Sequence, residues 1–272
     1  MMAFTTRIKS GVKPAGKHSR VLRWVLSAAF WLLVWQAAAM AVHEEILLVT
    51  PLAVARRLAQ LARTETFWLT VIGSMLRILL GFLLAMALGT LLAAATSRSS
   101  ICYTLFYPVI SIIKATPVAS FIILALVWFS SAKIPIFTSF LIAMPLFWQN
   151  VSNGIASTDR SLLEMASVYR FGRLRKLTAV YVPSVLPYFS AACSTGIGMA
   201  WKAGVAAEVL ANTKLSVGGN LYDAKIYLET PDLFAWTAAI VILSVALEKG
   251  LGRLLRRRST AGMGEAKHDS GI

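Results

Sequence analysis

The sequence predicts an all-α polytopic membrane protein with six transmembrane helices. Of its 272 residues, 57% are hydrophobic and 14% are charged, whereas soluble domains contain about 25% charged residues. The apolar residues are grouped in segments close to or above the length of about 20 residues that a helix needs to cross a bilayer. We expect these spans at residues 21–42, 67–96, 105–130, 135–154, 185–210 and 233–250.

The basic residues predict how these spans are oriented. The net charge is +15, and most Lys and Arg residues lie near the two termini and in the central loop. Cytoplasmic loops are enriched in Lys and Arg because these residues resist translocation. We therefore predict a basic cytoplasmic tail (1–23), a transmembrane domain (24–258) with a cytoplasmic central loop (155–183), and a second cytoplasmic tail (259–272).

The same charge distribution indicates whether the chain binds nucleic acid or lipid. A strongly basic chain can bind nucleic acid or anionic lipid. Here the basic residues are not interleaved with aromatic residues on one face. Topology and anionic membrane lipid explain this distribution, so we expect contact with lipid and none with nucleic acid.

The first span has two interpretations. Residues 21–42 follow a basic segment and include the small residues 37–39, a pattern that also fits a secretory signal peptide. We favour an uncleaved span because the apolar run is long for a signal peptide and further spans follow it. On either interpretation the N-terminus stays in the cytoplasm.

The segment after the first span is expected outside the cytoplasm. Within it, Val54, Leu58 and Leu61 fall on one helical face, while Arg56 and Arg57 face away from it. This pattern indicates a short helix lying on the lipid headgroups. A surface for an extracytoplasmic partner is the other interpretation, and the two are compatible.

Glycine spacing predicts close contacts between spans. Gly73, Gly81 and Gly89 recur every eight residues in the second span, which brings them near one face of the helix. Small residues also run through the fifth span. Such residues let neighbouring helices approach closely in a membrane.

Proline and glycine also mark irregular backbone. Pro108 and Pro117 fall inside the third span. Prolines there leave backbone groups that protein or water must satisfy, which favours a position facing the bundle interior. Between the last two spans, residues 212–232 are expected outside the cytoplasm, with a turn at Gly218-Gly219-Asn220.

The motifs of common enzymes do not occur in the sequence. It contains no GxxxxGK[ST] P-loop, so it has no such site of its own for ATP. HExxH, CxxC and GxSxG are missing as well, and Cys102 and Cys193 have no metal-ligand spacing. We expect no cofactor, metal or catalytic group, so any energy source must come from a partner.

Charged residues within the predicted spans are the candidates for a translocation path: Arg77, Lys114, Lys202 and Glu208. Each would cost a few kcal/mol if it faced lipid, so we expect a bundle interior, a cavity or a paired neighbour. A structural ion pair or a span-end position is the alternative for each. If the cations do line a path, it favours anions by direct Coulomb attraction.

The spacing of these residues limits how they pair. Lys202 and Glu208 are six residues apart in the sequence, so on one regular helix they point to different sides. A pair between Arg77 and Glu208 is the hypothesis that the sequence leaves open.

The central loop contains the most specific motif. Glu164-Met165-Ala166 is followed, nineteen residues after the glutamate, by Pro183. This pattern resembles the "EAA" loop of ABC-transporter permeases of the binding-protein-dependent import class. In that family the loop forms two short helices, and the first docks into a cleft on a separate ATP-hydrolysing subunit.

One position departs from the family pattern. The family places a glycine six residues after the glutamate, to turn between the two helices. Here that position is Arg170, and the nearest glycine is Gly172. We therefore expect a turn of different shape.

The resemblance also suggests roles for individual residues of the loop. Glu164 is expected near a helix N-terminus, where a carboxylate offsets the helix dipole. Ala166 is expected to be small enough for close docking. Pro183 is expected to end the loop and to set the entry of the fifth span.

The resemblance extends over most of residues 50–255, and there it is to the nitrate/sulfonate/taurine branch of these permeases. The matching stretches are 74–77 with Gly81, 116–119 with Trp128-Phe129, 153–154 and, above all, Trp201-Lys202-Ala203-Gly204-Val205-Ala206-Ala207-Glu208.

This resemblance implies the type I ABC importer permease fold in a bacterial inner membrane. It also implies alternating access, two ATPase subunits, an extracytoplasmic solute-binding protein and a second permease copy. The expected solute is a sulfonate, nitrate or a heterocyclic vitamin precursor.

Two other classes of protein stay open at this stage. A secondary transporter or channel would use an ion gradient rather than ATP. Such proteins often show inverted repeats and broken helices, and the mid-span prolines are compatible with this class. An integral membrane enzyme, such as a lipid-modifying transferase, would need acidic, His or Cys groups clustered at one membrane face, and the acidic residues here do not cluster.

Overall fold

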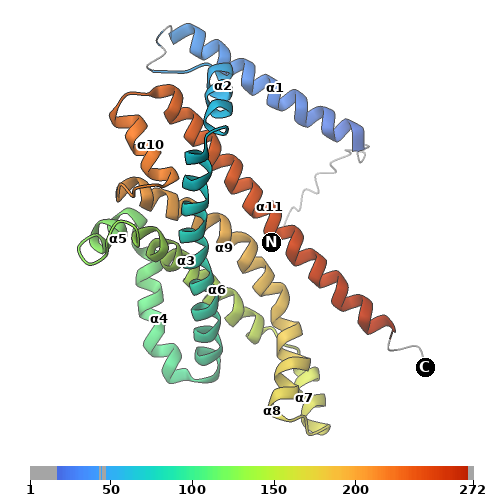
Figure 1. The fold of residues 1–272 in the computed structure, drawn as a ribbon. Helices are drawn as coiled ribbons and strands as arrows, with labels where there is room; N and C mark the ends of the chain where they lie inside the picture. The colour runs from blue at the N-terminus through green and yellow to red at the C-terminus, as the bar shows by residue number, and fades with distance from the viewer. Residues whose placement is uncertain (1–16, 43, 45–46, 269–272) are drawn as a thin grey trace, which may run out of the picture.

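The computed structural model describes residues 17–42, 44 and 47–268, most of which form helices (Figure 1). Five helices are long and apolar enough to cross a membrane, and a sixth span comes from a bent pair. The predicted six-span, all-α fold is therefore confirmed. In chain order the helices are α1 (Lys17–Val42), α2 (Pro51–Leu61), α3 (Glu65–Arg98), α4 (Ser100–Ala115), α5 (Val118–Ala125), α6 (Ile134–Ala156), α7 (Arg160–Val168), α8 (Arg173–Lys176), the π-helix η1 (Leu177–Tyr181), α9 (Val182–Leu210), α10 (Val217–Ile226) and α11 (Thr230–His268).

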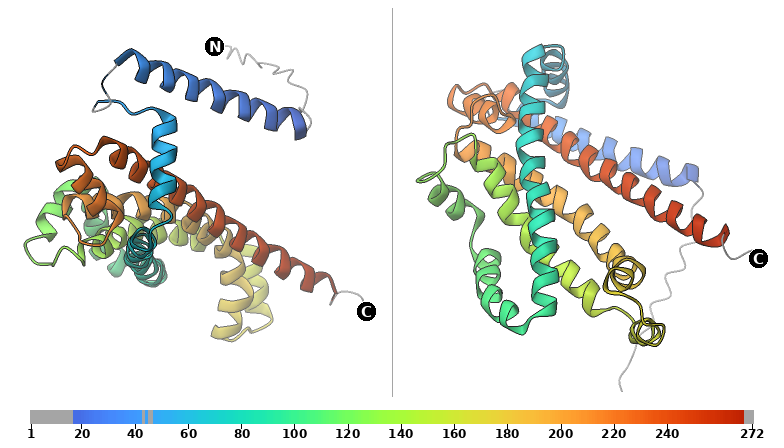
Figure 2. Two further views of the ribbon diagram at one scale, coloured as in Figure 1. Left: turned by 45° about the horizontal axis from the view of Figure 1, so that its top comes forward. Right: turned by 60° about the horizontal axis from the view of Figure 1, so that its bottom comes forward.

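The bundle has two distinct ends. Helices α7 and α8 form one end, which we call the loop end, and α2 and α10 lie at the other, which we call the α10 end (Figure 1). Helix α1 is largely separate from the bundle, to which it is joined through α2 (Figure 2), and it contacts α11 where Trp35 lies against Phe234. Only 6% of its apolar window is buried in this chain, so lipid or another chain must cover the rest of it.

Helices α3, α6 and α9 form the core because small residues let their backbones approach. An added Cβ at Gly81 would lie 2.9 Å from Ser139 Cβ and would collide with the Ile136 carbonyl oxygen of α6. At Gly89 an added Cβ would lie 2.8 Å from both the Met144 oxygen and Phe147 Cβ. The predicted glycine contact is confirmed for these two positions.

The third glycine of the series has a different neighbour. A Cβ at Gly73 would face the backbone oxygen of Leu215, at 3.3 Å, in the segment between α9 and α10. The glycine spacing therefore predicted the helix face correctly but not all of its neighbours. The face meets α6 along most of its length and a connecting segment at the α10 end.

The third predicted span is not a straight helix. Helices α4 and α5 meet at an angle of 103°, and the break falls at Thr116, whose backbone is extended (φ −81°, ψ 133°). The residue before a proline is pushed out of the helical region, and Pro117 supplies no N–H to continue the ladder. Pro108 is exposed on α4, so the expectation that the prolines face the bundle interior is wrong within this chain.

The predicted turn at Gly218-Gly219-Asn220 is wrong, because these residues begin α10. Ser216 is the N-cap, and its Oγ accepts a hydrogen bond from Gly219 N at 2.9 Å. A Cβ on Gly218 would lie 2.7 Å from both Val205 O and Val209 N. Gly218 therefore allows α10 to pack against α9, and Gly219 lies against the segment that connects the two helices.

Helix α2 packs on protein rather than on headgroups. Its predicted apolar face, Leu58 and Leu61, joins a buried cluster around Phe67 and Trp236. Arg57 forms an ion pair with Asp232 at the start of α11, so this arginine does not face away as predicted. The Asp232 carboxylate raises the pKa of Arg57 through this hydrogen-bonded pair. Because the apolar face is covered, the interfacial interpretation is wrong for it.

The predicted tails overlap with helices. Residues 17–23 form the first turns of α1, and α11 continues through 259–268. Residues 1–16 and 269–272 of the predicted tails lie outside the described residues. The assignment of both tails to the cytoplasm stays a prediction.

We predict that Gly81→Ala destabilises the bundle whereas Gly250→Ala does not. The new methyl group at position 81 meets backbone on α6, and overpacking of this kind costs about 1–3 kcal/mol. At Gly250 nothing lies within 4 Å of the added Cβ, and alanine favours a helix by about 0.5–1 kcal/mol. Thermal unfolding in detergent compares the two, and an equal shift for both would contradict close packing of α3 on α6.

Candidate functional site

The loop between α6 and α9 begins with a capped helix. Asp159 is the N-cap of α7, and its Oδ1 accepts a hydrogen bond from Ser161 N at 2.9 Å. This backbone N–H, with the Ser161 side chain, lowers the pKa of Asp159. Glu164 lies in the middle of α7 and is exposed. The expectation that Glu164 lies near the helix N-terminus is wrong, because Asp159 has that position.

Arg170 takes the conformation that a glycine would adopt easily. Its φ is +50°, in the left-handed region. The Ala166 oxygen accepts from Phe171 N at 2.8 Å, and the Ser167 oxygen accepts from Arg170 N at 3.0 Å, as in a Schellman C-cap. The chain therefore makes the turn with an arginine, and the expected change of shape does not follow from the missing glycine.

Gly172 does not replace the missing glycine. Its φ is −61°, a value open to other residues, and it is the N-cap of α8. An added Cβ there meets nothing within 4 Å. The reversal of the loop thus depends on Arg170 alone.

The two residues after Glu164 face in opposite directions. The Ala166 side chain is buried, with 2% exposure, whereas Met165 is exposed. Helix α7 contacts η1, so Ala166 belongs to a contact inside the loop. The interpretation of Ala166 as a docking residue is therefore corrected: its small side chain serves internal packing.

Pro183 does not start a separate helix, because α8, η1 and α9 follow one another without a break. At the junction, Val182 N donates to the Leu177 oxygen, five residues back. Pro183 has no N–H to give, and its ring disfavours a regular α-turn before it. The structure places Pro183 in the first turn of α9, as expected, and adds a π-turn before it, a feature often found at functional sites.

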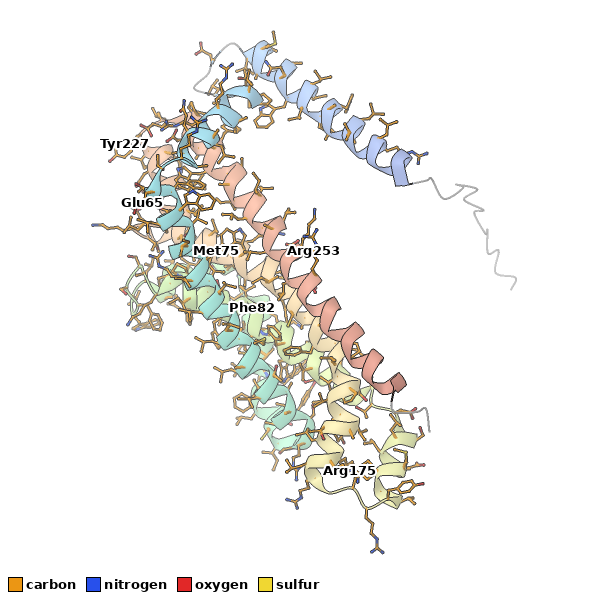
Figure 3. The ribbon with its side chains drawn as sticks, turned by 45° about the vertical axis from the view of Figure 1, so that its right-hand side comes forward. Glu65, Met75, Phe82, Arg175, Tyr227 and Arg253 are labelled. Atoms are coloured by element: carbon orange, nitrogen blue, oxygen red, sulfur yellow. The ribbon has the colours of Figure 1, made fainter. Side chains whose placement is uncertain are left out.

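Large apolar side chains are exposed on the loop. Val168, Tyr169 and Leu174 are 79%, 72% and 80% exposed. We call these three residues, with Leu162 and Met165, the loop patch. Arg175 lies over the Phe171 ring at 4.4 Å, a cation–π contact that supports the reversal. Figure 3 shows Arg175 at the loop end, far from Tyr227 at the α10 end.

A groove opens beside the loop end. It has a volume of about 750 Å³ and lies between the end of α3, the end of α6, η1 and the start of α9. Most of its lining is apolar, and its polar lining residues are Thr90, Ser97, Arg98 and Tyr181. Movement of η1 would change the shape of this groove, because Leu177 and Tyr181 form one of its walls.

Glu208 is a fully buried carboxylate that joins three helices. Its Oε2 accepts from Ser74 Oγ of α3 at 2.8 Å and from Gly218 N of α10 at 3.1 Å. Its Oε1 lies 3.5 Å from a terminal nitrogen of Arg77. The open hypothesis of an Arg77–Glu208 pair is confirmed.

The connection between α9 and α10 depends on the same cluster. Ser74 Oγ accepts from Val217 N at 2.9 Å, and Arg77 donates to the Leu215 oxygen at 3.3 Å. Two residues of this connection, Asn212 and Leu215, have positive φ values of 43° and 48°. The ion pair therefore holds a strained segment against α3.

Lys202 and Lys114 have different surroundings from this pair. Both side chains are exposed in the chain, so the structure does not bring them into the cluster of Arg77 and Glu208. Lys202 lies in the last third of α9 and is exposed whereas Glu208 is buried, so the two point to different sides as their spacing predicted. Lys114 lies at the last turn of α4, just before the break.

Comparison with known proteins identifies the family. Residues 78–260 match the model of the binding-protein-dependent transport system inner membrane component. This match covers more than half of the chain. The chain belongs to this family. The predicted ABC transporter permease of the sulfonate/nitrate/taurine type is thus confirmed.

Named relatives resemble this permease over most of its length. The taurine transport system permease protein TauC of Escherichia coli (strain K12) is 26% identical over 92% of this chain and 97% of its own. The putative aliphatic sulfonates transport permease protein SsuC of Bacillus subtilis (strain 168) is 26% identical over 90% of this chain and 89% of its own.

Solved structures share the fold. An amino acid ABC transporter crystallised with histidines aligns with a TM-score of 0.61 at 16% identity, over 74% of this chain and 97% of that chain. A bacterial alginate ABC transporter, in complex with an alginate-bound periplasmic protein, aligns with a TM-score of 0.59 at 13% identity, over 87% and 94%.

Sequence reasoning missed two features of the permease. It did not identify the loop patch, although an apolar run among the basic residues of a cytoplasmic loop would have indicated it. It also left Glu248 out of the charged residues within the spans. The structure places Glu248 within the last spanning window, against α9.

We predict that Arg170→Gly stabilises the loop. A left-handed backbone costs an L-residue about 1–2 kcal/mol, and glycine avoids this cost. Arg173→Gly is the matched control, because it removes the same charge from the helical residue Arg173 and should destabilise by about 1 kcal/mol. Hydrogen exchange of the α7 amides measures both, and faster exchange in Arg170→Gly would contradict the turn geometry.

We predict that Glu208→Ala destabilises the permease far more than Glu208→Gln. Both variants remove the charge that pairs with Arg77, but only the alanine leaves the Ser74 and Gly218 donors without an acceptor, and each buried unsatisfied group costs about 1–3 kcal/mol. The glutamine still offers a carbonyl oxygen to Ser74 and Gly218. Thermal unfolding in detergent distinguishes the variants, and equal stability of the two would show that the carboxylate oxygens do not hold α10.

Proposed function

We propose that this permease is the solute-conducting subunit of an ATP-driven importer, and that separate ATPase subunits dock on the loop between α6 and α9. The observation that supports this most directly is the loop patch, which exposes Val168, Tyr169 and Leu174 beyond the bundle. Exposed apolar patches outside the core mark interaction sites. Basic residues flank the patch and fit a partner of complementary charge.

The loop has the rigidity that such docking needs. Asp159 caps α7, the Arg170 turn reverses the chain, and Arg175 stacks on Phe171. Helix α8 then continues through η1 into α9. A displacement of the loop by a partner would therefore act on α9, with the π-turn as the flexible point.

A second permease copy is proposed to complete the solute path. Helix α4 is covered by this chain at Ile110 and is otherwise largely exposed. One face of α9 shows polar and small residues at helical spacing, namely Ser194, Thr195, Lys202 and Ala206, all exposed. Charged side chains in spans face a bundle interior or water rather than lipid, so this face is proposed to line the path.

Among the four predicted path residues, we now assign two different roles. Arg77 and Glu208 pair with each other and hold α10, so we propose a structural role for them. Lys202 and Lys114 are exposed and are proposed to face the path. The names of the relatives, which refer to taurine, aliphatic sulfonates and nitrate, support a small solute with an anionic group.

The orientation follows from the same proposal. A loop that meets an ATPase lies in the cytoplasm, which places both termini there and the α10 end outside. A solute-binding protein would then deliver solute at the α10 end. Membership of the family favours this proposal over a secondary transporter or an integral membrane enzyme.

We predict that Tyr169→Asp reduces recovery of the ATPase with the tagged permease by at least about tenfold. A buried carboxylate would replace an aromatic anchor, and loss of such an anchor costs about 2 kcal/mol or more. Tyr227→Asp is the matched control, because Tyr227 is equally exposed, at 72%, at the other end. Mass spectrometry of material pulled down from native membranes measures recovery, and equal recovery in both variants would place the docking elsewhere.

A further inference from the structure

The last span carries a carboxylate that packs against α9. Glu248 lies within the spanning window Thr230–Arg253 of α11. It packs over Gly198 of α9, where an added Cβ would lie 2.9 Å from Glu248 Cδ and 3.2 Å from its Cγ. Any side chain at position 198 would displace the Glu248 carboxylate, so the carboxylate can lie here only because residue 198 is a glycine.

The depth of this contact follows from its place on α9. Gly198 is about 18 Å along the helix from the end of α9 at Leu210. The hydrocarbon core of a bilayer is about 30 Å thick, so this distance places Gly198 within the part of α9 that can cross it. Arg253, five residues beyond Glu248 on α11, still lies well away from Arg175 at the loop end (Figure 3).

Glu248 has no ion pair or hydrogen bond within the described part of the chain. Its side chain is partly exposed, in contrast to Glu208, which is buried and paired. An unpaired charge at this depth costs a few kcal/mol unless it faces water or an opposite charge. Glu248 therefore needs a neighbour of that kind.

The geometry of α9 places Lys202 near Glu248. Positions 198 and 202 are one turn apart, and residues at this spacing are about 6 Å apart on a helix surface. Lys202 is exposed, and its flexible four-carbon stem can turn toward Gly198. The carboxylate and the ammonium group therefore flank one stretch of the exposed α9 face.

We propose that Glu248 and Lys202 form a charge-balanced station in the solute path. Such a station suits a solute that has both an anionic group and a protonated amine, because each group meets its opposite charge. A simple anion is attracted by Lys202 but repelled by Glu248. Glu248 is thus a further residue that determines specificity, and this proposal depends on the path proposed along α9.

The size of the effect follows from Coulomb's law. A single charge at about 8 Å changes the local concentration of a monovalent ion about twofold in water and about thirtyfold at an effective dielectric constant of 20. Neutralising Glu248 should therefore raise the local concentration of anions near position 248 by a factor within this range. The expectation of a purely anion-selective path is revised accordingly.

The test measures the charge at two reporter cysteines, Ser194→Cys and Ala206→Cys. Ser194 lies one turn before Gly198, and Ala206 lies one turn beyond Lys202. Each reporter is introduced separately into a permease that carries Cys102→Ser, which removes a competing thiol, and is studied in native membranes. Cys193 is buried and stays in place, and the parent without a reporter gives the background. Two membrane-impermeant methanethiosulfonate reagents, one cationic and one anionic, are compared by their rates.

The expected result is specific to position. Glu248→Gln lowers the ratio of the cationic to the anionic rate at Ser194→Cys by at least about twofold, and Lys202→Gln raises it at Ala206→Cys. The control Lys249→Gln, one residue along and on another face of α11, leaves both ratios unchanged.

Two outcomes would overturn the proposal. If neither reporter reacts, the α9 face meets lipid. If Glu248→Gln leaves the ratio at Ser194→Cys unchanged, the carboxylate points elsewhere. Neither outcome touches the proposed docking of an ATPase, which the recovery of that subunit with Tyr169→Asp tests separately.

Discussion

The buried Glu208 carboxylate is the interaction on which the α10 end depends. A buried carboxylate is costly unless protein groups stabilise it, and here Oε2 accepts hydrogen bonds from α3 and α10 while Oε1 faces Arg77 of α3. The same requirement explains Gly218 of α10, because only a residue without a Cβ lets its backbone approach α9 this closely. A strained connection is thereby held in place, so this end of the bundle forms one unit with α3 and α9.

The loop end is built by a different principle, since it lies beyond the bundle and has fewer buried contacts. Its geometry comes from the helix cap at Asp159, the left-handed backbone conformation of Arg170 and the π-turn at η1 rather than from a packed core. Helix α9 connects the two ends: it begins beside the loop and ends at Glu208. A force applied at the loop can therefore act on the α10 end through a single long helix that packs closely on α6.

Much of this arrangement could be predicted from sequence. Apolar segment lengths predicted the spans, glycine spacing predicted the contact of Gly81 and Gly89, and the spacing of Glu208 and Lys202 predicted that they point to different sides of α9. The bend at Thr116, the start of α10 and the burial of Ala166 could not be predicted in this way, because each depends on contacts with elements distant in the chain. The pairing of Arg77 with Glu208 was only one of several combinations until the helices were placed.

The measurement that tests the permease mechanism most directly is site-specific photo-crosslinking from position 168 in native membranes. Val168 is 79% exposed on the loop patch, and Leu228, 72% exposed at the α10 end, is the control position. The predicted result is a crosslink from position 168, and not from position 228, to a protein whose peptides contain a P-loop. Crosslinks from position 168 to lipid alone, or to an extracytoplasmic protein, would contradict both the docking surface and the orientation of the chain.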